Sequence, residues 1–248
     1  MRKWIPYLLL SLALLGVWHY FGSHNRTVRL LVSSPALVAQ YFSANAGDLL
    51  KAAGITLAEA VAGLTIATAF SFLMMMLCFY KPRLLDFILP VMITSQVIPI
   101  IVLAPFFIIL LGIGLTSKIA MAAVISFFPV FINFSQGFKA IGTNIHEMFY
   151  IYNAPLGFRI RKVYFPLAMP SIMAGLKVSA TLATIGAIVA EFTGAEIGLG
   201  KNLFLSAIRL EPELMMVSLL LSALSGGLLF GSMWALERKY GKWYVDTQ

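Results

Sequence analysis

Charged residues are scarce in this sequence. They make up 11% of its 248 residues, whereas 60% are apolar and the mean hydropathy is +0.90. A soluble globular domain usually carries about 25% charged residues and roughly 45–50% apolar ones. A soluble domain of this length cannot bury so much apolar surface, so the composition predicts an integral membrane protein.

Residues that bind metals or carry out catalysis are equally few. The single cysteine, Cys78, excludes an internal disulfide and a metal site built from several thiolates. The three histidines, His19, His24 and His146, lie far apart in the expected topology, so no metal site is predicted. No glycine-rich phosphate loop followed by Lys and Ser or Thr occurs. This chain is therefore not expected to bind ATP, to hold a cofactor or to be an enzyme.

The net charge of +8 would suggest a nucleic-acid partner in a soluble protein. Here the basic residues lie in short clusters between apolar runs, where they set the orientation of a membrane protein. Nucleic acid is therefore not an expected partner, and membrane lipid is.

The apolar residues form runs with the length of membrane-spanning helices, which need about 20 residues. These runs lie at 4–21, 57–80, 85–113, 118–137, 167–194 and 214–236. The expected fold is all-α, a polytopic membrane protein with about six transmembrane helices. The run 85–113 contains Pro90, Pro99 and Pro105 and is expected to be kinked or broken. Because protein or water must cover the freed backbone groups, this run is expected on the inside of the bundle.

The chain begins like a signal peptide, with Arg2 and Lys3 before an apolar run. Bulky aromatic residues follow that run in place of a small-residue cleavage site, so a retained first helix is expected. Connections on one side of the expected spans hold more Lys and Arg than those on the other side. The richer side is predicted to be cytoplasmic, which places both termini inside.

The expected domain organisation is simple. Residues 1–50 are predicted to form the first transmembrane helix and an outer loop, and residues 51–243 the main transmembrane domain. Alternating small, apolar and polar residues within 22–56 suit a helix on the membrane surface. A long inner loop, residues 138–166, connects the fourth and fifth spans.

This inner loop carries apolar residues, among them Met148, Phe149 and Phe158, where water is expected. An apolar patch in water usually marks a protein interface. The alternative is a loop in the headgroup layer with its basic residues on lipid phosphates. A turn at residues 153–155 is expected to separate a first helix from a second, basic one that stops at Pro166.

Lys177 is a charge within an expected span, and two roles remain open for it. An ionisable group in a membrane suggests contact with substrate or a gate. The alternative is a long side chain that extends to the inner headgroups. Phe106, Phe107, Phe127 and Phe128 either line a pathway or fill the bundle.

Several motifs occur in a characteristic order. Glu147, Asn153-Ala154 and Phe165-Pro166 match the acid, the Gly-Ala and the Leu-Pro of a known cytoplasmic coupling loop. Residues 191–200 read Glu-Phe-Thr-Gly-Ala-Glu-Ile-Gly-Leu-Gly, and Ser33-Ser34-Pro35 and Leu111-Gly112-Ile113-Gly114 precede them at comparable positions. With these motifs, residues 30–240 resemble the permeases of binding-protein-dependent ABC importers, in the nitrate, sulfonate and taurine branch.

The sequence departs from that family in the coupling loop. Met148-Phe149 stands where the family usually has Ala-Ala, and Asn153 stands where it has Gly. Asn tolerates the left-handed backbone conformation better than most residues, so the turn is expected to persist.

The resemblance implies a type I ABC importer fold in the bacterial inner membrane. It implies a homodimer of this permease, a cytoplasmic ATPase dimer that holds ATP and Mg, and an extracytoplasmic binding protein. The resemblance assigns ATPase coupling to Glu147, Met148, Phe149, Asn153, Ala154, Pro155, Leu156, Gly157 and Phe158. Lys177 and Glu191 are candidates for the pathway or a gate, and Gly112, Gly114, Gly175 and Gly186 for close helix contacts.

The resemblance leaves the solute open between small anions of the nitrate, sulfonate and taurine kind and thiamine precursors or other heterocycles. A secondary transporter or channel that no ATPase drives is the alternative function. It would need energising or selective polar residues within its spans, and the sequence offers few.

Overall fold

The computed structural model describes residues 10, 13, 16–20, 22, 32–141, 145, 148–149 and 151–240. Within these ranges the secondary structure is helical and no strand occurs, as expected for an all-α protein. The helices are α3 (Pro35–Tyr80), α4 (Pro82–Ser95), α5 (Ile100–Leu111), α6 (Leu115–Lys139), α8 (Leu156–Arg159), the π-helix η1 (Ile160–Tyr164), α9 (Phe165–Gly194), α10 (Leu199–Arg209) and α11 (Pro212–Tyr240).

Four helical segments are long and apolar enough to cross a membrane. They are α3, α6, the continuous stretch Leu156–Gly194 and α11, and the bent pair of α4 and α5 adds a fifth. Each corresponds to one of the predicted runs between residues 57 and 236. The first predicted run, 4–21, lies mostly outside the described residues.

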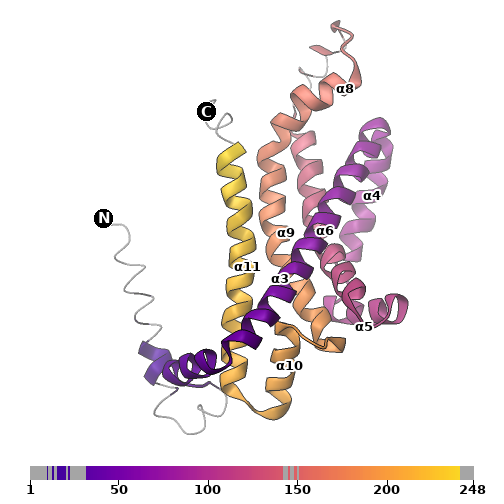
Figure 1. Cartoon of the computed structure of the whole chain (residues 1–248). Helices are drawn as coiled ribbons and strands as arrows, with labels where there is room; N and C mark the ends of the chain where they lie inside the picture. Colours follow the sequence, from indigo (N-terminus) through magenta and orange to yellow (C-terminus); the bar gives the residue numbers. More distant parts are fainter. Residues whose placement is uncertain are drawn as a thin grey trace.

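α3 is much longer than the run that predicted it. It starts at Pro35, a residue whose fixed φ suits the first turn of a helix. Asn45 leaves the helical conformation with φ −121° and ψ 21°, which kinks the helix. The part before the kink lies across one end of the bundle, and the part after it rises obliquely along the bundle (Figure 1). α3 is continuous through residue 50. The division of the chain into residues 1–50 and 51–243 stays a prediction.

The proline-rich run is broken, as the sequence predicted. α4 and α5 meet at an angle of 102°, and Pro99 precedes the first residue of α5. The expected place inside the bundle is wrong for a single chain, because large apolar side chains of both helices are exposed. Phe87 is 70% exposed, Ile101 64% and Ile109 82%. No described part of the chain covers these side chains or the free backbone groups at the break.

The centre of the bundle is a close crossing of α3, α6 and α9 (Figure 1). Ala122 of α6 is fully buried there between Gly63 of α3 and Gly186 of α9. A Cβ on Gly63 would lie 2.5 Å from the Cβ of Ala122, and one on Gly186 would lie 2.9 Å from its Cα. The backbones approach this closely because these positions lack larger side chains.

The glycines named from the sequence divide into two groups. Gly186, and Gly175 beside Asn133 and Pro129, lie at close helix contacts as expected. Gly112 and Gly114 have open space around them in the single chain, so their assignment to close contacts within it was wrong.

We expect Gly186→Ala to lower the free energy of unfolding by about 1–3 kcal/mol, because the added methyl group overpacks the crossing. Gly114→Ala is the matched control, since Gly114 has an extended backbone with φ 163° and no neighbour at the Cβ position. Thermal denaturation of the two purified variants in detergent measures the difference. Equal midpoints would show that the crossing does not limit stability.

Candidate functional site

The inner loop projects beyond one end of the bundle, at α8 (Figure 1). We call its described residues, 148, 149 and 151–159, the inner elbow. Ile151 and Tyr152 are 77% and 76% exposed, and Met148 and Phe158 are 43% and 52% exposed. The elbow therefore presents an apolar edge outside the bundle. Glu147, the acid of the predicted coupling motif, lies outside the described residues.

Phe149 differs from its neighbours in the elbow because it points into the bundle. It is 3% exposed, and its ring packs edge-on against Tyr164 at 5.7 Å between centroids. Phe149 thus belongs to the aromatic core that includes Phe138 and Phe131. Its role in ATPase coupling stays a prediction, and in this structure its side chain anchors the elbow to the bundle.

The turn of the elbow is held by Arg159, a residue that the sequence motifs did not single out. Its Nε donates a hydrogen bond to the carbonyl of Ala154 at 2.6 Å, and Nη2 donates to that of Phe149 at 3.2 Å. The same guanidinium lies 5.7 Å from the centre of the Phe149 ring. Asn153 has φ +44°, the left-handed conformation that the sequence led us to expect. Pro155 follows in an extended conformation and precedes α8.

The helix after the turn does not stop at Pro166 as predicted. α8 passes into η1 and then into α9 without interruption, and Pro166 occupies the first turn of α9. Pro166 has no N–H to donate to the preceding turn, and the π-turn of η1 directly before it changes the hydrogen-bond register, so the helix continues past the proline. The elbow is consequently joined to a long helix that crosses the whole bundle.

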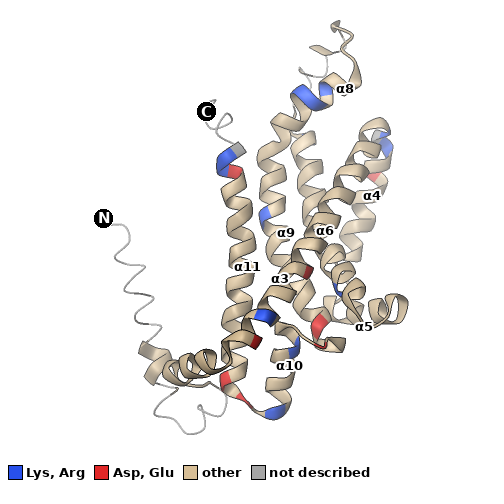
Figure 2. Ribbon diagram, viewed as in Figure 1, with Lys and Arg blue, Asp and Glu red and all other residues tan. Residues whose placement is uncertain are grey.

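Lys177 of α9 forms an ion pair with Glu237 of α11. Its Nζ lies 2.7 Å and 2.9 Å from the two carboxylate oxygens, and the side chains are 22% and 30% exposed. Glu237 lies near the end of α11 that carries Arg238 and Lys239 (Figure 2). The Lys177 side chain thus extends toward that end of the bundle, as in the second of its two predicted roles. The ion pair also links α9 to α11.

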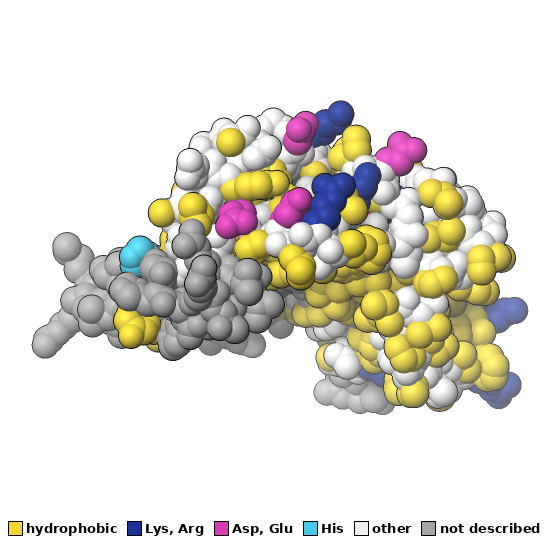
Figure 3. All heavy atoms as spheres, turned by 90° about the horizontal axis from the view of Figure 1, so that it is seen from below, with side chains coloured by type: hydrophobic (Ala, Val, Ile, Leu, Met, Phe, Trp, Pro, Cys, Tyr) yellow, Lys and Arg dark blue, Asp and Glu magenta, His cyan; other side chains and the backbone are white. Residues whose placement is uncertain are grey.

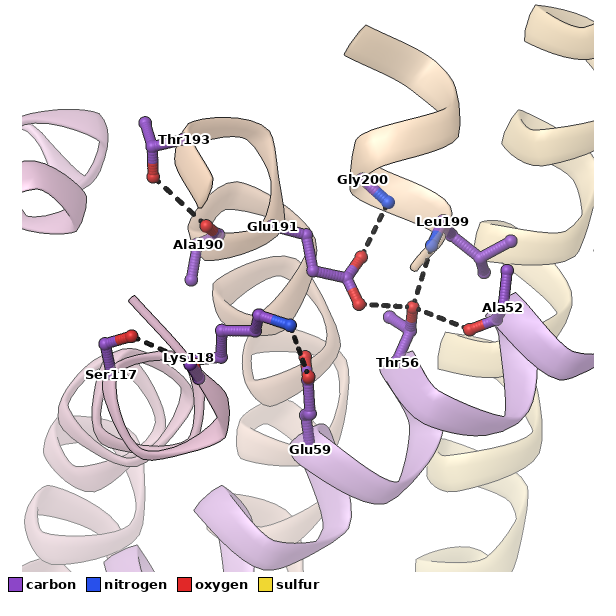
Figure 4. Close-up of polar contacts among 11 residues, drawn as sticks. Ala52, Thr56, Glu59, Ser117, Lys118, Ala190, Glu191, Thr193, Leu199 and Gly200 are labelled. Atoms are coloured by element: carbon purple, nitrogen blue, oxygen red, sulfur yellow. Dashed lines mark hydrogen bonds and ion pairs between the residues drawn. The ribbon is translucent and has the colours of Figure 1, made fainter. Parts of the chain in front are cut away.

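A second polar site lies at the opposite end of the bundle and is centred on Glu191 of α9 (Figure 4). The Thr56 hydroxyl donates to Glu191 Oε1 at 2.7 Å, and the Gly200 N–H donates to Oε2 at 2.6 Å. The Leu199 N–H donates to the Thr56 oxygen at 3.0 Å. Glu191 is 1% exposed. The Thr56 hydroxyl and the buried Glu191 carboxylate thus satisfy the first two N–H groups of α10 and fix this helix to α3 and α9.

This arrangement explains the glycines of the motif at residues 191–200. Gly198 has φ +154°, and a Cβ there would overlap the Glu191 carboxyl group. A Cβ on Gly200 would overlap the carbonyl oxygen of Ile188 and lie 2.7 Å from the Cβ of Glu191. The two glycines of the motif therefore leave the space that the Glu191 carboxylate occupies.

An ion pair extends this site to α6. Lys118 Nζ lies 3.1 Å from Glu59 Oε1, and both residues are at least nine-tenths buried. Glu59 Oε2 has no hydrogen-bond donor among the described residues. We call Thr56, Glu59, Lys118, Glu191 and Gly200 the outer network.

The sequence reasoning missed most of this network. It singled out Lys177 and Glu191, whereas Glu59 and Lys118 also lie within long apolar helices and were not named. The missed signal was an acid near the start of one span and a lysine at the start of another. Such residues face each other when neighbouring helices start at the same end of a bundle. Within the described ranges, no group of three or more His, Cys, Asp and Glu forms a possible metal site.

The protein has apolar spanning helices, an exposed elbow at one end of the bundle and a closed polar network at the other. These features are those of a membrane permease. The chain belongs to the family of binding-protein-dependent transport system inner membrane components, whose model matches residues 67–242. It is a permease subunit of an ABC importer. The family favours this function over the secondary transporter or channel that the sequence left open.

Curated relatives agree with this family. The chain is 30% identical over 233 residues to a probable ABC transporter permease protein of Haemophilus influenzae, covering 93% of this chain and 95% of that one. It is 34% identical to the riboflavin transport system permease protein RibX of Chloroflexus aurantiacus, covering 86% and 80%. It is 24% identical to the putative aliphatic sulfonates transport permease protein SsuC of Bacillus subtilis, covering 97% and 88%.

We expect Glu191→Ala to loosen α10, because it leaves the Gly200 N–H buried without its acceptor. The Thr56 hydroxyl then keeps only the Ala52 carbonyl of its own helix and no longer joins α3 to α9. The cost is about 1–3 kcal/mol, and hydrogen exchange of the amides at residues 195–202 should accelerate. Thr193→Ala is the control, since the Thr193 hydroxyl bonds only to the Ala190 carbonyl of its own helix. Unchanged hydrogen exchange in the Glu191 variant would show that the network does not hold α10 in place.

We expect Lys177→Met and Glu237→Met each to destabilise the protein more than the double change, because each single change leaves one charge unpaired. For this partly exposed pair the effect is about 1 kcal/mol or less. A swap, K177E with E237K, should restore stability, as measured by thermal denaturation. Uptake assays separate the two roles of Lys177, because loss of uptake in the stable double variant would show a role in the pathway.

Proposed function

We propose that this permease works as a homodimer bound to two copies of a cytoplasmic ATPase and carries a small solute into the cell. ATP and Mg bind to the partner ATPase, and this chain supplies the membrane pathway. The observation that carries the proposal is the inner elbow, whose exposed apolar edge is held in a fixed shape by Arg159 and Phe149. A rigid apolar edge in water is suited to a protein partner.

The elbow would transmit the movement of the ATPase to the membrane helices. Met148, Ile151 and Phe158 would lie in a cleft of the ATPase, and α8 continues through η1 into α9. A shift of the elbow therefore acts directly on α9, which packs against α6, α3 and α11. ATP binding would change the relative populations of inward-facing and outward-facing packings of these helices.

The orientation of the chain follows from its charges. Arg159, Arg161 and Lys162 lie on and just after α8, at the same end of the bundle as Arg238 and Lys239 (Figure 2). Lys and Arg are enriched on the cytoplasmic side of membrane proteins, which supports a cytoplasmic elbow and cytoplasmic termini. The outer network would then lie on the extracytoplasmic side.

The extracytoplasmic end offers a surface for the solute-binding protein. Viewed from that end, charged side chains of both signs gather among apolar ones (Figure 3). Glu196, Lys201, Arg209 and Glu211 lie on α10 or in the turns beside it, and Glu213 lies in the first turn of α11. A mixed charged surface suits a partner that must bind and then leave, because polar interfaces are typical of transient complexes.

The exposed apolar side chains of α4 and α5 support the homodimer. In a single chain they would face lipid or a second copy, and the broken backbone between the two helices is not tolerated against lipid. Lipid would then cover the remaining apolar surface of the bundle. The relatives named for riboflavin and for aliphatic sulfonates indicate a small organic solute, either a heterocycle or an anion.

We expect Phe158→Ala and Met148→Ala to weaken binding of the partner ATPase, because both remove exposed apolar contacts from the elbow. The loss should be about 1–3 kcal/mol for a contact at the centre of the interface, that is, about fivefold or more in Kd. Co-purification of the tagged permease with its partner ATPase provides the measurement.

Phe204→Ala is the matched control, since Phe204 is also an exposed phenylalanine (44%, against 52% for Phe158) and lies on α10 at the opposite end of the bundle. It should leave ATPase binding unchanged. Equal effects of the Phe158 and Phe204 changes, or no association with the ATPase at all, would contradict the proposed role of the elbow.

A further inference from the structure

A pocket of about 280 Å³ lies where α4, α5 and α6 meet at the helix break. This volume is close to the lower end of the range for small-molecule sites, which is about 300–1,000 Å³. α4 has 14 residues and begins next to Lys81 and Arg83. At 1.5 Å per residue the break lies about 20 Å along the bundle from that end, which is inside a hydrocarbon core of about 30 Å.

The break provides polar groups at this depth. The Gln96 amide is exposed and makes no hydrogen bond to another described residue. By contrast, the neighbouring hydroxyls of Thr94 and Ser95 bond back to the carbonyls of Pro90 and Met92. Gln96 is thus a polar side chain of the break that is available to a ligand.

The backbone adds donors beside this amide. The last three carbonyls of α4 already accept the N–H groups of residues 96–98, so the open backbone groups are those at the start of α5. α5 starts at Ile100, whose N–H belongs to the first helical turn and has no partner in the helix. The combination offers both donors and acceptors without a net charge.

The walls of the pocket are aromatic and aliphatic. Phe127 and Phe128 of α6 line it, together with apolar side chains of α4 and α5. The Phe127 ring is held by Phe70 at 5.2 Å and Phe131 at 5.8 Å between centroids, so it is a fixed surface against which a planar ring can stack.

Positive charge is not available to a solute in this pocket. All residues that line it are uncharged. The lysines at membrane depth, Lys118 and Lys177, are each occupied by a carboxylate, Glu59 and Glu237. A buried anion without a counter-charge is costly, whereas an uncharged polar ring needs only a few hydrogen bonds.

We propose that this pocket is a transient solute site in the translocation pathway and that it selects an uncharged, planar nitrogen heterocycle over a small anion. The inference rests on the proposed importer function and adds the class of solute to it. The faces of the ring would stack on Phe127 and Phe128, and its edge would bond to the Gln96 amide and the open backbone. The second copy of the chain would close the exposed side of the break.

The test uses the complex of this chain with its ATPase and binding protein in liposomes that contain ATP. Uptake of a labelled aminopyrimidine and of a labelled alkanesulfonate is measured at the same concentration. The pyrimidine should accumulate and the sulfonate should not. Gln96→Leu should lower pyrimidine uptake by about tenfold, the effect of one lost hydrogen bond of about 1.4 kcal/mol.

Thr94→Val is the control, because it also replaces a polar group with an apolar one but lies outside the pocket lining. It should leave uptake unchanged. Co-purification with the ATPase and the ATP hydrolysis stimulated by the binding protein verify that each variant assembles. A fully assembled Gln96→Leu complex with normal pyrimidine uptake would overturn the role of Gln96.

The remaining outcomes separate this inference from the proposed function. ATP-dependent uptake of the sulfonate alone would overturn the selectivity and leave the importer function intact. An assembled complex that takes up neither solute would also overturn the proposed solute class. Failure of the chain to associate with any ATPase would overturn the importer function, and the pocket assignment would fail with it.

Discussion

The close crossing of α3, α6 and α9 is the contact on which the rest of the structure depends. Ala122 fits between Gly63 and Gly186 because neither glycine has a Cβ. In a bilayer the helices gain little from apolar burial against each other, so close backbone approach and dispersion contacts hold them together. With this crossing fixed, the two ends of the bundle hold the two sites in place, the apolar inner elbow at one end and the polar outer network at the other.

Sequence patterns predicted the parts that follow from one helix at a time. Length and hydropathy located the apolar helices from residue 57 onward, and three prolines marked the break between α4 and α5. They failed where the outcome depends on a neighbouring helix. Glu59, Lys118 and Glu191 come from three helices, and the spacing along one helix does not reveal which residues of another face it.

The inner elbow illustrates the same limit. Asn153 was expected to adopt a left-handed turn, and it does, because that preference is local. Phe149 was expected on the partner surface but packs on Tyr164, and Arg159 was overlooked although it holds two carbonyls of the turn. Both outcomes depend on the position of the turn relative to the end of the bundle, which the motif does not contain.

The π-helix between α8 and α9 has a geometric consequence for the evolution of the complex. Each residue of an α-helix turns the chain by about 100°, and a π-turn accommodates one extra residue without ending the helix. Gain or loss of a residue within Ile160–Tyr164 would rotate α8 about the axis of α9 and leave the crossing at Ala122 unchanged. Related chains could in this way adapt to ATPases with differently placed grooves while keeping the same membrane core.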